Sequence, residues 1–207
     1  MEESMEKSRV DESRPERENS VFILTCPWGY SEKNPEHKRY KPIKKFVLLD
    51  LIRMFWNAAD IEPFVVCPDQ EMGDFCNLFI QTGGCDDLYE TMDITRACWE
   101  GNVTFILGNY KYTKRAIYNI VFDIEPNSIV FYMLNTEDEK SNIVAITAHS
   151  NTLYSLKSLG ILMASSKFPQ DHSLNSVYET LKMYREDLWN KRQILLVVRK
   201  ADATPKY

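Results

Sequence analysis

The order of apolar and polar residues divides the chain into short elements from residue 20 onward. Compact apolar runs that end at polar or proline positions predict buried strands, and apolar residues that recur every three or four positions predict helices. The strands of this kind are predicted at 20–26, 62–68 and 193–199. The helices are predicted at 42–58, 70–81, 86–99, 150–162 and 173–190. Pro42 suits the first position of its helix, because a proline has no amide hydrogen to leave unpaired there.

Between residues 102 and 148 the pattern changes to an alternation with a period of two. The runs at 102–109, 114–124, 128–135 and 142–148 predict strands. The links between them are short, and short links join antiparallel neighbours, so a meander is expected. The run at 128–135 is apolar in both phases, which predicts a central strand covered on both faces.

Together these elements predict an α+β fold in a single domain at 20–200. Its sheet is expected to be mixed and mostly antiparallel, with the meander at 102–148, and to be flanked by helices. Residues 1–19 carry seven acidic and four basic side chains and few apolar ones, so they predict a disordered charged tail. Residues 201–207 are expected to form a flexible C-terminal tail.

Charge and composition exclude several classes of function and location. A formal net charge of −5 argues against a general nucleic-acid coat. The longest apolar run, 46–56, contains Asp50 and Arg53 and is well short of the roughly 20 residues that span a bilayer, so no membrane segment is expected. The N-terminus has no apolar run of a secretory signal, which predicts a cytoplasmic or nuclear protein. The five cysteines form no CxxC pair, so reduced thiols are expected, with no metal and no cofactor.

Asp123 and Glu125 are the sharpest candidates for chemistry. If 117–124 is a strand, their side chains leave the same face, roughly 6 to 7 Å apart at the backbone. Two carboxylates so placed can share metal ions that activate water and stabilise a leaving oxygen. His149, at the end of another predicted strand, is the third candidate for this site. The same carboxylates also fit an ordinary solvent-facing strand end beside a turn at 126–127.

The segment ValPheAspIleGlu at 121–125 resembles the first motif of the DEDD exonuclease family, which is commonly written PheAspIleGluThr. The segment at 148–159 is similar to the second motif of that family, although Ser155 stands where the motif carries an aspartate. The segment TyrArgGluAsp at 184–187 is the one available for the third motif. The resemblance implies an RNase H-like nuclease that uses Asp123 and Glu125.

Two regions are candidates for binding. Residues 33–45 interleave basic side chains with aromatic rings, a combination that can follow a phosphate backbone and stack bases, or can simply be a solvated loop. Tyr184 and Trp189, on the predicted helix at 173–190, are the expected anchors of a protein interface. The basic-segment candidates are Lys38, Arg39, Tyr40, Lys41, Lys44 and Lys45.

Cys26 with His149 is a further alternative, as a thiol nucleophile and its base, against a buried structural thiol at Cys26. Because no catalytic set is complete, the sequence is interpreted as a non-enzymatic adaptor, a subunit of an intracellular complex with protein partners. A nucleic-acid contact through 33–45 is an additional expectation, and no membrane contact is expected. The alternative interpretation is a metal-dependent nuclease of degenerate DEDD or RNase H-like type that uses Asp123 and Glu125.

Overall fold

The structure is a computed structural model that describes residues 19–25, 43–68, 70–82, 88–135, 142–158 and 174–205. Of the tail predicted at 1–19, only Asn19 is among the described residues, and it opens the first strand. Within the described ranges, no helix has both the length and the apolar character needed to cross a membrane. The cytoplasmic or nuclear location stays a prediction.

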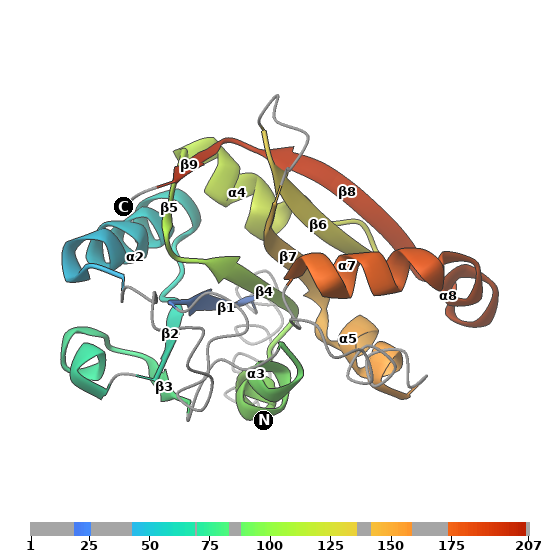
Figure 1. Cartoon of the computed structure of the whole chain (residues 1–207), viewed down its shortest axis with the longest axis horizontal. Helices are drawn as coiled ribbons and strands as arrows, with labels where there is room; N and C mark the ends of the chain where they lie inside the picture. The colour runs from blue at the N-terminus through green and yellow to red at the C-terminus, as the bar shows by residue number, and fades with distance from the viewer. Residues whose placement is uncertain are drawn as a thin grey trace, which may run out of the picture.

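A seven-stranded sheet forms the centre of the molecule (Figure 1). Its strands follow the order β3-β2-β1-β4-β7-β6-β8. All neighbours pair in parallel except β7, which runs antiparallel to both β4 and β6. The strands are β1 (Asn19–Leu24), β2 (Phe64–Cys67), β3 (Phe79–Gln81), β4 (Asn102–Leu107), β6 (Ser128–Leu134), β7 (Ile143–His149) and β8 (Leu195–Ala201). A separate two-stranded ribbon pairs β5 (Tyr110–Tyr112) with β9 (Ala203–Pro205).

Helices cover both faces of the sheet, and each face has its own apolar core. The first core packs α2 (Lys45–Ala59) and α4 (Lys114–Phe122) against the sheet, with Phe55 and Ile117 fully buried. The second core packs the other helices against the opposite face, where Leu156 and Leu181 are fully buried. Those helices are α3 (Leu88–Thr95), α5 (Ser150–Ser158), α7 (Leu174–Met183) and α8 (Arg185–Arg192). The described part of the chain is therefore a three-layer α/β fold (Figure 1).

The expected mostly antiparallel meander is wrong, and the reason lies in residues 114–124. This segment forms helix α4, because Ala116, Ile117 and Ile120 are buried at helical spacing and the Thr113 side chain accepts a hydrogen bond from the Ala116 amide at 3.1 Å. A helix between two strands of one sheet makes a parallel crossover. The strands β4 and β6 are consequently parallel, and the meander does not exist.

Three smaller expectations also change. The segment predicted as a helix at 70–81 contains the 3-10 helix η3 (Gln70–Phe75) followed by strand β3. The single helix predicted at 173–190 is two helices, because the chain leaves helical geometry at Tyr184, where φ is −99° and ψ is 14°. Residues 203–205, within the expected C-terminal tail at 201–207, form β9. A further short 3-10 helix, η4 (Arg96–Cys98), follows α3.

Candidate functional site

The carboxyl ends of the parallel strands meet at one edge of the sheet, which we call the carboxyl edge. In open α/β sheets, ligands bind in the crevice outside these strand ends. The described segments that leave this edge are Thr25 after β1, Pro68 after β2, Thr82 after β3, Gly108–Thr113 after β4, Asn135 after β6 and Asp202 after β8. In Figure 1, β5, β9 and the start of α4 come together on this side of the sheet. These segments are the starting point for a candidate site.

The turn after β4 is held tightly against β1. The Gly108 amide donates a hydrogen bond to the Leu24 carbonyl at 2.9 Å. A Cβ at position 108 would lie 2.9 Å from Ile23 Cγ2 and 3.1 Å from Ile43 Cδ1, which is too close for any other residue without a shift of these neighbours. The glycine therefore lets the turn sit directly on the end of β1, and the next residue, Asn109, is exposed at the edge.

The ribbon of β5 and β9 brings the C-terminal segment to this turn. Tyr110 pairs with Pro205 and Tyr112 pairs with Ala203 in antiparallel register. The Thr113 amide donates to the Asp202 carbonyl at 3.2 Å, just before helix α4 begins. Segments that are about ninety residues apart in the chain thus share one corner of the fold.

Asp202 is the carboxylate of this corner. Its Oδ1 accepts a hydrogen bond from Asn135 Nδ2 at 2.9 Å, and the Asn135 amide donates to the Ala201 carbonyl at the same distance. Both side chains are exposed. The end of β6 therefore sets the position of a carboxylate that follows β8.

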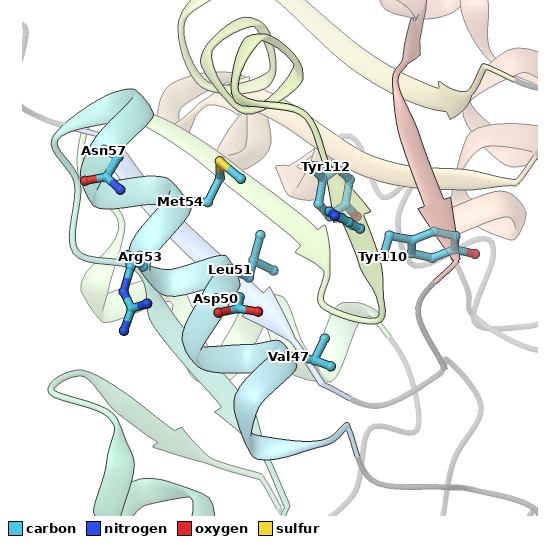
Figure 2. A pocket seen from close by; sticks show the side chains of 9 residues that line it. Val47, Asp50, Leu51, Arg53, Met54, Asn57, Tyr110 and Tyr112 are labelled. Carbon is cyan, nitrogen blue, oxygen red and sulfur yellow. The ribbon is translucent and has the colours of Figure 1, made fainter.

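A cavity of about 280 Å³ lies between α2 and β5 (Figure 2). Its apolar wall includes Leu51 and Met54 of α2, which face Tyr112 across the opening, and Asp50, Arg53 and Lys111 add charged groups to the lining. The Tyr112 hydroxyl donates to the Leu107 carbonyl at 2.6 Å. Burial raises the pKa of Tyr112 well above its ordinary value, and the nearby Tyr110 acts in the same direction, so the phenol stays protonated as a donor.

A smaller cavity of about 150 Å³ lies beside Asp202. It is lined from α4 by Arg115 and Asn119, from β6 by Tyr132, and by Asp202. The Tyr132 hydroxyl donates to the Asn119 carbonyl at 2.9 Å, and burial raises the pKa of Tyr132 as the largest of several effects. The corner thus combines a carboxylate, a guanidinium and hydrogen-bonding groups within one hollow.

The carboxylates singled out from the sequence lie elsewhere. Asp123 is the C-terminal cap of α4, and its Oδ2 pairs with Arg199 Nη1 at 3.0 Å, while Arg199 also donates to the Asp123 carbonyl. Glu125 is exposed in the loop before β6, where its carbonyl accepts from Ser128 Oγ at 2.6 Å. Neither belongs to a strand, so the same-face geometry expected of them is absent. Both precede the amino end of β6, at the edge opposite the carboxyl edge.

His149 ends β7, which runs against the other strands, so it also lies at the amino edge. Its register partner is Asn102, the first residue of β4, and its Nδ1 accepts a hydrogen bond from the Asn151 amide at 3.2 Å. Among the described residues, no three His, Cys, Asp or Glu side chains come together in a way that could hold a metal ion. His149 therefore adds no third ligand to Asp123 and Glu125. The other half of the thiol alternative, Cys26, is outside the described residues.

The binding candidates are only partly described. Lys38, Arg39, Tyr40 and Lys41 lie outside the described residues, and nucleic-acid binding by 33–45 stays a prediction. Lys44 is the N-cap of α2, with its Nζ 6.0 Å from the centre of the Phe46 ring, and Lys45 Nζ lies 3.1 Å from the centre of the Phe75 ring.

Tyr184 and Trp189 do not belong to the carboxyl edge. Tyr184 is partly buried against the second core at the start of α8, and Trp189 is 49% exposed. Their role as interface anchors stays a prediction.

Sequence reasoning missed Asn109, Asn135 and Asp202. A usable signal was present for Asn135, which comes directly after the apolar run at 129–134, and residues at such positions gather at one edge when the strands are parallel. The signal was lost when 114–124 was assigned to a strand, since an antiparallel meander sends successive strand ends to opposite edges.

Comparisons with known proteins show the fold. The sequence matches no protein-family profile and no curated protein. Among solved structures, the inositol-1-phosphate CTP transferase from T. maritima is similar at a TM-score of 0.54 and 12% identity, over 90% of this chain and 88% of that one. The CMP:2-keto-3-deoxy-manno-octonic acid synthetase complexed with CTP is similar at a TM-score of 0.52 and 11% identity, over 92% of each chain. A protein named mannose-1-phosphate geranyltransferase, from Thermus thermophilus, gives a TM-score of 0.52 at 8% identity, over 90% of this chain and 76% of that one.

These likenesses correct the functional interpretation. All three proteins are named as transferases or synthetases, and each matches about nine-tenths of this chain. The DEDD-like nuclease required Asp123 and Glu125 on one strand, but Asp123 is the cap of helix α4 and Glu125 lies in the loop after it. The adaptor was inferred because no catalytic set was complete, and the likeness of the fold to proteins named as transferases and synthetases overturns that inference. Neither interpretation is retained.

Proposed function

We propose that this protein binds a nucleoside triphosphate at the carboxyl edge and transfers its nucleotidyl group to a small acceptor that carries an acidic or phosphate group. The observation that carries the proposal is the fold itself, because the two similar structures named for CTP match it over 88% to 92% of their own length. A shared fold supports the place of binding more strongly than the chemistry. The proposal is therefore built on the groups present at that edge.

The described residues offer suitable recognition groups. Lys111 of β5 and Arg115 of α4 add positive charge to the linings of the two cavities, where a triphosphate or an acidic acceptor carries negative charge. Asp202 and Asn109 offer oxygen acceptors at exposed positions for the hydroxyl groups of a ribose or an acceptor. The cavity between α2 and β5 has the mixed apolar and polar lining that is typical of small-molecule sites.

The proposed transfer is a substitution at the α-phosphorus of the nucleotide. An oxygen of the acceptor attacks this phosphorus, a new phosphorus–oxygen bond forms, and the bond to the β-phosphate oxygen breaks as pyrophosphate leaves. The protein contributes alignment of the two reactants and positive charge around the phosphates. The described cations that line the two cavities and can supply that charge are Arg53, Lys111, Arg115 and Lys200.

The first test is nucleotide binding by the full chain, measured calorimetrically with CTP, UTP, GTP and ATP as their magnesium salts. We expect saturable binding of at least one of them with a Kd below about 1 mM. The second test is pyrophosphate release with a panel of sugar phosphates, polyol phosphates and acidic sugars. Asp202→Asn is expected to impair turnover, while the matched change Asp187→Asn, at an exposed position of α8, leaves it intact. The absence of binding to all four nucleotides contradicts the proposal.

A further inference from the structure

Among the described residues, strand β8 forms one outer edge of the main sheet, and a row of its backbone groups faces outward. The Leu195 amide donates to the Asn127 carbonyl and the Ala201 carbonyl accepts from the Asn135 amide, so the odd-numbered residues of β8 direct their hydrogen-bonding groups toward β6. Successive residues of a strand direct these groups to opposite sides. The amides and carbonyls of Leu196, Val198 and Lys200 therefore point away from β6.

The sequence of β8 does little to block pairing at this edge. Natural edge strands are usually short, bulged, interrupted by proline or charged along their length. β8 has seven residues in unbroken register with β6, and it contains no proline or glycine. Leu195 is 46% exposed, and Val197 and Val198 are partly exposed. Of its two cations, Arg199 is already paired with Asp123.

We propose that β8 pairs with β8 of a second copy of this chain, antiparallel about a two-fold axis at Val198. In this register Val198 faces Val198 of the partner subunit, and Leu196 faces Lys200 of the partner subunit. These are the residues whose backbone groups point outward, and none is a proline, so the pairing forms about six backbone hydrogen bonds. The two sheets become one continuous sheet across the axis.

Charge and shape agree with this register. Lys200 lies opposite an apolar residue, and Arg199 lies opposite Val197 of the partner subunit, so no like charges face each other. The pair of Val198 side chains at the axis is a β-branched cross-strand contact of the kind that stabilises sheets. The exposed Leu195 lies opposite Ala201 of the partner subunit, so two apolar residues meet there.

The other edge of the sheet explains why a second copy pairs through β8 alone. That edge is β3, which has three residues and cannot match the length of β8. A head-to-tail contact between β8 and β3 would therefore be short, whereas the contact of β8 with itself uses its full length. An isologous contact closes after two subunits and does not grow into a filament.

The test is sedimentation equilibrium of the full chain up to concentrations on the order of 100 μM. The wild type is expected to sediment as two chains. Val198→Pro is expected to weaken association at least about tenfold without unfolding the subunit, because the amide it removes faces outward and proline is tolerated on such positions of edge strands. A circular dichroism spectrum and a thermal melt establish that the subunit is folded.

A second variant covers the case in which Val198→Pro fails to fold. Val198→Lys places two positive charges opposite each other at the axis and keeps the backbone amide, so it is also expected to dissociate the dimer. Met183→Lys is the matched control, since Met183 is 75% exposed at the end of α7 and takes no part in β8. A monomeric wild type, or a dimer that persists in a folded Val198→Lys variant, overturns the inference.

Discussion

Asn135 and Asp202 are 67 residues apart in the chain, yet the side-chain amide of Asn135 donates a 2.9 Å hydrogen bond to the carboxylate of Asp202. The contact links the end of β6 to the end of β8 at the carboxyl edge. Among the described residues, Asp202 is the only carboxylate that directly follows a parallel strand of the main sheet at this edge. The hydrogen bond therefore ties its position to the end of a neighbouring strand.

If nucleotide transfer uses Asp202, Asn135 acts through it as a positioning residue. Asn135→Ala is expected to lower turnover by up to about 100-fold, since misplacement by roughly 1 Å can cost that much. The free energy of unfolding should fall by no more than about 1 kcal/mol, because the hydrogen bond is exposed. In a double-mutant cycle with Asp202→Ala, the losses in turnover should overlap and not add. Additive losses would show that the two residues act independently.

Gly108→Ala is expected to destabilise the fold by about 1–3 kcal/mol, because the new Cβ overlaps Ile23 in a packed region. Urea unfolding followed by circular dichroism measures this change. Asn109→Ala, at the exposed neighbouring position, is the control and should stay within about 0.5 kcal/mol of the wild type. Equal effects of the two substitutions would mean that the turn does not sit against β1 as described.

A buried hydroxyl pair ties α4 to the sheet. Thr147 Oγ1 donates to the Ile120 carbonyl at 2.7 Å and lies 2.9 Å from Thr104 Oγ1. Thr147→Val leaves these groups without that partner and is expected to cost about 1–3 kcal/mol of unfolding free energy. Thr204→Val, on the exposed side of β9, is the control. A neutral Thr147→Val would argue against the helical placement of residues 114–122.

Asp123→Asn tests the role of the acidic pair that the sequence emphasises. The ion pair with Arg199 is partly exposed, at 58% for the Asp123 side chain and 26% for that of Arg199, so its loss should cost only about 0.2–1 kcal/mol and less at high salt. Nucleotide binding and turnover should be unchanged, because the residue lies at the amino edge. Thermal melts at low and high salt, together with calorimetric binding, measure both effects. A loss of turnover in a folded variant would return this residue to the active site.

Alkaline pH should destabilise the protein through its buried phenols. Burial raises the pKa of Tyr112 above the ordinary value near 10, so the folded state holds a proton that the unfolded state releases. The stabilisation is complete below about pH 10 and declines as pH rises from there toward the folded pKa. Urea unfolding at a series of pH values from about 8 to 11 measures the slope. Tyr112→Phe should flatten it, and Tyr118→Phe, at a position 54% exposed, should not.

Several elements could be predicted from the local sequence, because a segment that is buried on both faces is apolar at nearly every position. The apolar runs at 20–26, 62–68 and 128–135 became β1, β2 and β6, and the widely apolar run at 42–58 became α2. Residues 114–124 were wrongly predicted to be a strand, since their apolar positions fit a period of two as well as a helical period. One such assignment changed the direction of a strand, and with it the fold class and the location of the site.

The sequence by itself determined which segments are apolar enough to be buried, because burial depends on side chains that are adjacent in the chain. Only the tertiary structure decided strand direction, strand order and the contact between Asn135 and Asp202, because those depend on segments many residues apart. Asp123 and Glu125 show the difference most clearly. Their spacing is local, but whether they face each other depends on a helix that the rest of the fold stabilises.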